Sequence, residues 1–253
     1  MPTADPTQRF SSRVDNYVRY RPGYPAEVLA LLEEQCRLTP DKVVADIASG
    51  TGLWTRLLLE NGNPVLGVEP NQDMRNAGEE FLRGYPRFTS VAGAAEATSL
   101  PDRSVDIVTA AQAAHWFDRP RARCEFVRIL KPGGWTVLLW NERLTDSTPF
   151  LRAYEQLLVD FGTDYKEVRH ERTTAEIRGF YAPSSYQEAV FQYRQGFDYE
   201  GLEGRLLSSS YTPQPGHAKY APMLQALRRI FDQHQRGGQV HFDYNTRVFY
   251  GVL

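Results

Sequence analysis

Short apolar runs alternate with amphipathic stretches as far as Asn141. The apolar runs predict strands at residues 43–47, 64–69, 88–92, 106–111 and 135–140. Apolar residues three and four positions apart predict helices at residues 26–36, 53–60, 71–82 and 118–130. Strands that alternate with helices through short turns favour βαβ units, a parallel sheet and right-handed crossovers.

The two ends of the chain follow other patterns. Residues 7–20 have the spacing of one amphipathic helix, and a Pro/Gly cluster at 21–25 ends it. After Asn141 the regular alternation stops. We predict helices at 150–161, 202–209 and 220–234, strands at 186–197 and 241–252, and a loop or short helices at 165–183. The second half thus supplies two late strands and a helical insertion that can cover a pocket.

Length and composition favour one enzyme-sized domain. The chain has 253 residues, 42% of them hydrophobic, and a net charge of -2 from 29 basic and 31 acidic side chains. This balance gives no overall positive field for a nucleic acid. The only cysteines, Cys36 and Cys124, are not in a metal-ligand spacing, and no metal site is predicted. Without a signal pattern or a membrane-length apolar run, we expect a cytoplasmic protein.

A glycine-bearing turn, DIASGTG at residues 46–52, directly follows the first predicted strand. Gly50 and Gly52 lack the Cβ atoms that would keep a ligand away from the backbone. A lone Gly-x-Gly is weak evidence, because any tight strand-to-helix turn can use it. Whether this turn binds a ligand is therefore judged from the residues around it.

Carboxylates end the first two predicted strands. Asp46 ends the first strand and Glu69 the second, at the sheet edge where doubly wound folds bind ligands. Glu69 can accept both ribose hydroxyls; the alternative is a solvated carboxylate or a cap for the helix at Asn71. The turn lacks the third glycine of a diphosphate cradle, and Asp46 suits a cationic amino group better than a diphosphate. The pattern predicts a nucleoside cofactor with a positively charged tail.

These motifs resemble the class I S-adenosylmethionine-dependent methyltransferases over most of the chain. DIASGTG is similar to the family's first motif, and GVEP, GAAEATSLPDRSVDIV and ILKPGGWTVLLW follow in the family's order and spacing. YVRYRPGYP, AQAAHWFD, LLSSSYTP and HFDYNTRVFYG look more narrowly like the small-molecule branch that includes trans-aconitate methyltransferase-like proteins. The resemblance implies a Rossmann-like α/β fold with seven strands, the last antiparallel.

The resemblance also implies roles for individual residues in binding S-adenosylmethionine. Glu69 and Pro70 would lie at the ribose and Met74 beside the adenine. The methionine end would meet Asp46, Ala48, Ser49, Gly50, Thr51, Gly52, Ala111 and Gln112, and the adenine edge would meet Ala94, Ala95 and Glu96. Tyr17 and Arg21 would fold over the cofactor and reach its carboxylate or an acidic substrate; surface ion pairing for Arg21 and core packing for the tyrosine are the alternatives.

Two residues depart from the family pattern. Ala48 replaces the usual first glycine of the turn, and a methyl group fits there only if the backbone dihedrals suit alanine. Ala94 stands where many family members carry an aspartate that accepts a hydrogen bond from adenine. At these two positions, cofactor binding then depends on backbone groups.

The acceptor side of the predicted pocket is rich in aromatic residues. His115 follows the fourth predicted strand and is a candidate general base; a structural histidine that packs the loop is the alternative. Trp116 and Phe117 shape the pocket or face the sulfonium, with support of the loop as the alternative, while Tyr20 and Tyr211 are candidate pocket walls.

We therefore predict methyl transfer from S-adenosylmethionine to O, N or C of a small molecule by one domain. Residues 1–36 would form an N-terminal lid, 37–141 the cofactor-binding core, and 142–253 the late strands with a helical cap. Two other classes stay open: a nucleotide-dependent oxidoreductase, and a non-methylating cofactor-binding protein on the same fold.

Overall fold

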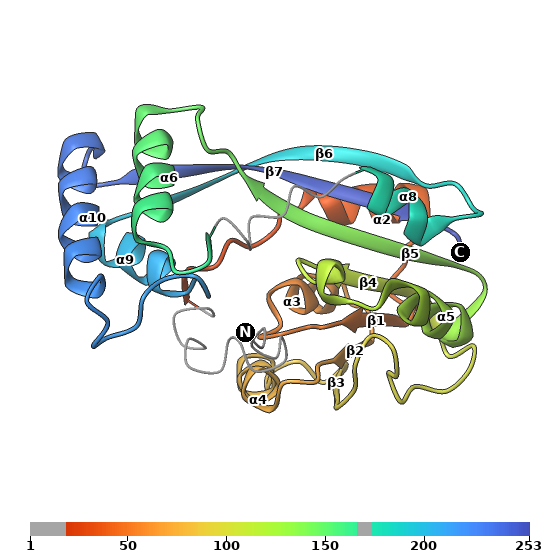
Figure 1. Ribbon diagram of the computed structural model, residues 1–253. Helices are drawn as coiled ribbons and strands as arrows, with labels where there is room; N and C mark the ends of the chain where they lie inside the picture. Colours follow the sequence, from red (N-terminus) through yellow and green to blue (C-terminus); the bar gives the residue numbers. More distant parts are fainter. Residues whose placement is uncertain (1–18, 166–173) are drawn as a thin grey trace.

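A seven-stranded sheet in the order β3-β2-β1-β4-β5-β7-β6 runs through the computed structural model, which describes residues 19–165 and 174–253 (Figure 1). Strands β1 to β5 are parallel, and β7 runs antiparallel to both β5 and β6. The predicted Rossmann-like sheet with an antiparallel last strand is confirmed. The strands are β1 (Val44–Ile47), β2 (Val65–Val68), β3 (Phe88–Val91), β4 (Val105–Ala111), β5 (Leu130–Arg143), β6 (Gln187–Phe197) and β7 (Val240–Gly251).

Most helices begin and end close to the predicted residues, and side-chain caps explain several starts. Asn71 and Asp118 accept hydrogen bonds from the backbone N–H of the third residue that follows each of them, at 3.0 and 3.2 Å. The helices are α2 (Glu27–Cys36), α3 (Leu53–Glu60), α4 (Gln72–Phe81), α5 (Arg119–Ile129), α6 (Pro149–Phe161), α8 (Thr174–Tyr181), α9 (Tyr199–Leu207) and α10 (Tyr220–His234), with a short 3-10 turn η3 (Ala114–Trp116).

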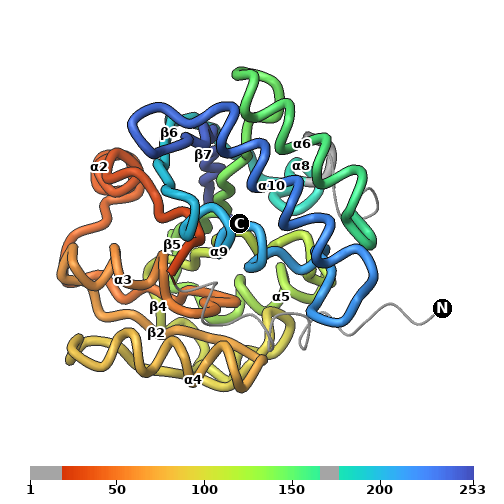
Figure 2. Tube along the Cα trace, turned by 90° about the vertical axis from the view of Figure 1, so that its left-hand side faces the viewer, coloured from red at the N-terminus to blue at the C-terminus, as the bar shows by residue number. Residues whose placement is uncertain are grey.

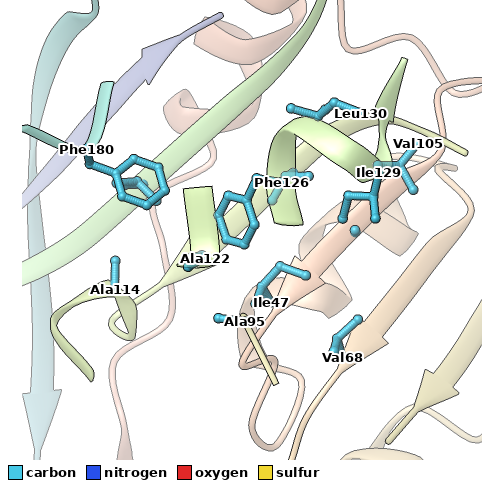
Figure 3. Packing of buried hydrophobic residues seen from close by; sticks show 14 of the residues in the cluster. Ile47, Val68, Ala95, Val105, Ala114, Ala122, Phe126, Ile129, Leu130 and Phe180 are labelled. Carbon is cyan, nitrogen blue, oxygen red and sulfur yellow. The ribbon is translucent and has the colours of Figure 1, made fainter. Parts of the chain in front are cut away.

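The sheet is covered on both faces, which is why β1 is buried along its whole length. On one face, Phe126 of α5 lies over Ile47, and Phe180 of α8 packs beside Phe126 with ring centroids 5.7 Å apart (Figure 3). On the other face, α2 and α3 contribute Val28, Leu32, Trp54 and Leu58 to a second apolar cluster.

The C-terminal helices form a cap at the far end of the long strands β6 and β7. Helices α6, α9 and α10 gather there, away from β1 to β3 (Figure 1), and α4 and α6 lie at opposite sides of the molecule (Figure 2). The cap has its own apolar cluster, which includes Leu158, Leu202, Leu227 and Phe242. Within the described ranges, no helix is both long and apolar enough to cross a membrane.

The boundaries of two elements differ from the prediction. Strand β5 begins at Leu130 and not at Trp135, because Val105 pairs with Leu130 while Ile107 pairs with Trp135, so that the intervening residues bulge out. It also continues to Arg143, where it pairs with β7 beyond the end of β4. Helix α9 begins at Tyr199, three residues before the predicted start, since Asp198 caps it. The helix predicted at 7–20 lies outside the described residues except for its last two.

The order of the strands determines where a ligand can bind. Strand β1 lies between β2 and β4: the chain places β2 and β3 on one side of β1 and then crosses to place β4 and β5 on the other side. At such a switch point the loops at the carboxyl ends of the strands separate and leave a crevice. Ile47 pairs with Val68 and Asp46 with Thr109, so the residues that follow these strands meet at one edge of the sheet.

Candidate active site

A cavity of about 380 Å³ lies at the carboxyl ends of β1, β2 and β4. This volume is in the range of pockets for small molecules and cofactors. The loops that follow the three strands form one wall. The opposite wall comes from the segment before α2, with Arg21, Pro22 and Tyr24, and from Ser210 and Tyr211 after α9.

Asp46 places a buried carboxyl at the floor of this cavity. It is 1% exposed, and its two oxygens accept hydrogen bonds from the hydroxyls of Thr55 at 2.6 Å and Thr109 at 3.1 Å. Burial raises the pKa of Asp46 to about 7, the two hydroxyls oppose this shift, and the nearby charge of Glu69 adds to it. Asp46 therefore changes its charge near neutral pH.

The turn after β1 is built from left-handed residues. Ala48, Gly50 and Gly52 have φ values of 55°, 58° and 86°. Gly52 does not line the cavity; it caps α3, where a Cβ would lie 2.6 Å from Leu82. Ala48 thus has a backbone conformation that suits glycine, and holding a non-glycine residue there costs about 1–2 kcal/mol.

Glu69 joins the loops after β1 and β2. One carboxylate oxygen accepts from the Gly50 N–H at 2.9 Å and the other from the Asn71 N–H at 2.8 Å. Burial raises the pKa of Glu69, against the effect of these two hydrogen bonds. A carboxylate has about four acceptor sites, so Glu69 keeps acceptor capacity toward the cavity that it lines.

Helix α4 and the loop after β3 form the next part of the wall. Gly78 allows α4 to approach the turn, because a Cβ there would lie 3.0 Å from the Gly50 carbonyl oxygen. Ala94 and Ala97 exchange two backbone hydrogen bonds, and Glu96 accepts from the Asp118 N–H at 2.8 Å. The loop is held by its own backbone at the position where the sequence lacks an aspartate.

The segment after β4 bends sharply into the cavity. Gln112 has a φ of 61°, and its side-chain amide donates to the Asn141 carbonyl oxygen at 3.2 Å. This bend leads into η3, where the rings of His115 and Trp116 lie 4.7 Å apart. Both line the cavity together with Phe117.

The opposite wall is fastened to the cap and to the sheet. Arg21 donates to the Ser208 carbonyl oxygen at 3.0 Å, just beyond α9. The side-chain amide of Asn141 in β5 donates to the Gly23 carbonyl oxygen at 2.8 Å and accepts from Thr246 in β7 at 2.5 Å. These contacts hold Arg21 and Tyr24 over the strand ends.

Comparison with known proteins agrees with this arrangement. Residues 45–138 match a family model described as a methyltransferase domain. An uncharacterised methyltransferase of Mycobacterium tuberculosis is 40% identical over 140 residues, 55% of this chain and 54% of that protein, so the match spans about half its length. An uncharacterised methyltransferase of Schizosaccharomyces pombe is 29% identical over 245 residues, 95% of each chain. A protein from Anaeromyxobacter dehalogenans described as a type II methyltransferase shares the fold, with a TM-score of 0.67, 23% identity and coverage of 92% of this chain and 97% of that one.

The chain is thus similar to methyltransferases over residues 45–138 and shares the methyltransferase fold.

The cavity brings together most of the predicted site residues. Those that line it are Arg21, Asp46, Ala48, Ser49, Gly50, Thr51, Glu69, Pro70, Met74, Ala94, Ala95, Glu96, Ala111, Gln112, His115, Trp116 and Tyr211. Tyr17 lies outside the described residues. Tyr20 is not a lining residue, because its ring packs against α9, where a Cβ on Gly204 would lie 2.1 Å away.

Sequence reasoning missed several residues that line the cavity. Tyr24 and Trp54 meet edge to face, with ring centroids 5.2 Å apart, at the side where the turn leads into α3. Pro22, Leu53, Asn71, Ala113 and Ser210 complete the set, each next to a predicted site residue in the sequence. Asn71 had a signal of its own, as a helix cap directly after Pro70, whereas the fold decides which of the other neighbours line the cavity.

Proposed function

We propose that the chain binds S-adenosylmethionine and transfers its methyl group to O, N or C of a small-molecule acceptor. The observation that supports this most is the pair of buried carboxyls, Asp46 and Glu69, at the ends of β1 and β2 in one cavity. Residues 46–52 contain no lysine or arginine. A site of this charge suits ribose hydroxyls and a cationic tail, and it is unfavourable for a diphosphate.

The residues present fit such a cofactor. Glu69 has acceptor capacity for ribose hydroxyls, and Asp46 suits the cationic amino group. Thr51 and Trp54 each have a buried polar atom, the hydroxyl oxygen and the indole nitrogen, that has no hydrogen-bond partner among the described residues. Both residues line the cavity, so a bound polar ligand would satisfy them.

The chemistry divides between the cofactor and the chain. Bound S-adenosylmethionine supplies a methyl group on a positively charged sulfur. The chain orients the acceptor and excludes water, and positioning alone supplies roughly 7–11 kcal/mol in well-oriented systems. The aromatic faces of Trp116 and Phe117 on the acceptor side suit the positive charge of the sulfonium.

His115 is our candidate for removing a proton from the acceptor. It lies in η3, at the end of the bend that begins at Gln112, and it lines the cavity. A positioned base contributes about 10² to 10⁴ in rate where the acceptor must lose a proton.

Calorimetric titration with S-adenosylhomocysteine tests the assignment with two matched variants. Glu69→Ala should bind at least about tenfold more weakly, because it removes a buried acceptor of charge-assisted hydrogen bonds. His115→Ala should keep the affinity, and with an acceptor panel and labelled S-adenosylmethionine it should turn over more slowly. NAD should not bind. Equal affinity of Glu69→Ala and wild type would contradict the ribose role, and absence of S-adenosylhomocysteine binding would contradict the function.

A further inference from the structure

The cap contains a buried group of charged and phenolic side chains behind the cavity. Arg205 of α9 is 6% exposed, and Tyr154 of α6 and Tyr244 of β7 are each 2% exposed. Arg143 at the end of β5 places its guanidinium over the Tyr154 ring, 5.2 Å from the centroid. We call Arg143, Tyr154, Arg205 and Tyr244 the cap cluster.

The positive charge of the cap cluster is only partly compensated. Arg143 forms an ion pair with Glu155, and the hydroxyl of Tyr165 donates to the same carboxylate at 2.7 Å. Arg205 donates to the Ser209 hydroxyl at 3.2 Å and forms no ion pair with any described residue. Among the described residues, the two guanidinium groups thus have one carboxylate, that of Glu155 at Arg143, in a buried environment where an uncompensated charge is unfavourable.

Three buried polar atoms of the cap cluster, Nη1 of Arg143, Nε of Arg205 and the hydroxyl oxygen of Tyr154, have no hydrogen-bond partner among the described residues. The hydroxyl of the fourth residue, Tyr244, accepts from the Arg205 guanidinium and keeps its own proton to donate. Burial raises the pKa of Tyr154, so its phenol stays protonated. All four groups can donate a hydrogen bond, so an acceptor with a negative charge would pair with them and complete the charge balance.

The cap cluster lies directly behind one wall of the cavity. Tyr211 lines the cavity, and its ring lies 4.8 Å from the ring of Tyr165, whose hydroxyl accepts from Arg143 at 3.1 Å. Ser209, the partner of Arg205, is next to the lining residue Ser210. Tyr211 therefore lies between the cavity and the cap cluster.

We propose that the cap cluster binds an oxyanion, a carboxylate or phosphate, of the methyl acceptor, with Arg205 as its counter-ion and Tyr211 between this group and the reacting end. The planar fork of arginine matches both oxyanions. The claim that the oxyanion belongs to the methyl acceptor rests on the proposed function. The claim that the cap cluster binds an oxyanion does not.

Three small anions and a neutral analogue test the proposal by calorimetry on protein saturated with S-adenosylhomocysteine. Benzoate, succinate or phenyl phosphate should bind, and benzamide should not. Arg205→Gln should weaken the binding at least about tenfold, because it removes the charged partner. The control Arg228→Gln, an exposed residue of α10 whose side chain is 55% exposed, should leave the binding unchanged. Failure of all three anions to bind, or equal binding by Arg205→Gln, would overturn the proposal.

Tyr154→Phe and Tyr244→Phe keep the ring volume and separate binding from folding. Each should weaken anion binding about threefold to tenfold. The Tyr154 hydroxyl has no hydrogen-bond partner among the described residues, so Tyr154→Phe should leave the thermal midpoint unchanged or higher, whereas Tyr244→Phe removes an acceptor of Arg205 and should lower the midpoint slightly. A lower midpoint with unchanged anion affinity would assign the hydroxyls to stability alone and overturn the proposal.

Two further measurements decide which molecule carries the oxyanion. If S-adenosylhomocysteine competes with benzoate, the site belongs to the cofactor's own carboxylate and the acceptor assignment is wrong. Should S-adenosylhomocysteine not bind at all, the proposed function fails, and titration of the free protein still tests the cap cluster.

Discussion

Ala48 is a point of local strain in the turn after β1. Its φ of 55° suits glycine, and Ala48→Gly should stabilise the chain by about 1 kcal/mol, the strain relieved less the extra unfolded-state entropy of glycine. The matched control is Ala94→Gly in the same cavity, where φ is not positive and glycine should destabilise by about 0.5–1 kcal/mol. Urea unfolding measures both free energies. Equal losses in the two variants would show that residue 48 is unstrained.

The protonation of Asp46 should make stability fall with rising pH. Its pKa is about 7 in the folded chain, against about 3.9 in an unfolded one, so the folded state holds the proton more tightly between these values. The free energy of unfolding then decreases toward pH 7, by up to about 1.4 kcal/mol per pH unit, and this contribution is constant above it.

The isosteric change Asp46→Asn replaces the titrating carboxyl with an amide that does not titrate. Urea unfolding from about pH 5 to pH 8 should give a flatter profile for the variant, so that the difference from wild type changes with pH below about pH 7 and is constant above it. Groups that do not interact with Asp46 affect both proteins equally and cancel in the difference. Parallel profiles would show that Asp46 is charged throughout this range.

At the scale of single elements, the sequence predicts the features that depend on residues close together in the chain. The 3.6-residue period gives α3 and α10 their observed bounds, and the carboxylates at the ends of β1 and β2 were predictable because strand ends meet at one edge of a parallel sheet. The extension of β5 to Arg143 was not predictable in this way, since it depends on pairing with β7, about 100 residues later in the chain.

In the candidate site, too, local features were predictable from the sequence and long-range contacts were not. The turn and Glu69 follow from neighbouring residues, whereas the contact of Tyr24 with Trp54 depends on where the segment before α2 crosses the sheet. Asn141 fixes that crossing through a hydrogen bond to Gly23, 118 positions away. Tyr20 was predicted to line the pocket, but Gly204 lets α9 pack against its ring instead. No local pattern encodes such distant contacts.

At the scale of the whole molecule, one continuous strand links the cap to the cofactor-binding core. Strand β7 pairs with β5 from Tyr244 to Gly251 and with β6 from Val240 to Tyr250, while Phe242 near its start is buried in the cap. The four tryptophans, Trp54, Trp116, Trp135 and Trp140, all lie outside the cap helices. Tryptophan fluorescence therefore reports on the core alone, whereas far-ultraviolet circular dichroism reports on helices of both parts.

We expect cap and core to unfold together as one cooperative domain. Phe242 is 0% exposed, and its ring contacts Phe150 and Tyr154 at centroid distances of 5.2 and 4.8 Å, so Phe242→Ala should destabilise by about 3–5 kcal/mol. If β7 transmits this loss, the denaturant midpoint of tryptophan fluorescence should move as far as that of circular dichroism, although the deleted ring is in the cap. A fluorescence midpoint that stays at the wild-type value would instead divide the chain into two independently unfolding parts.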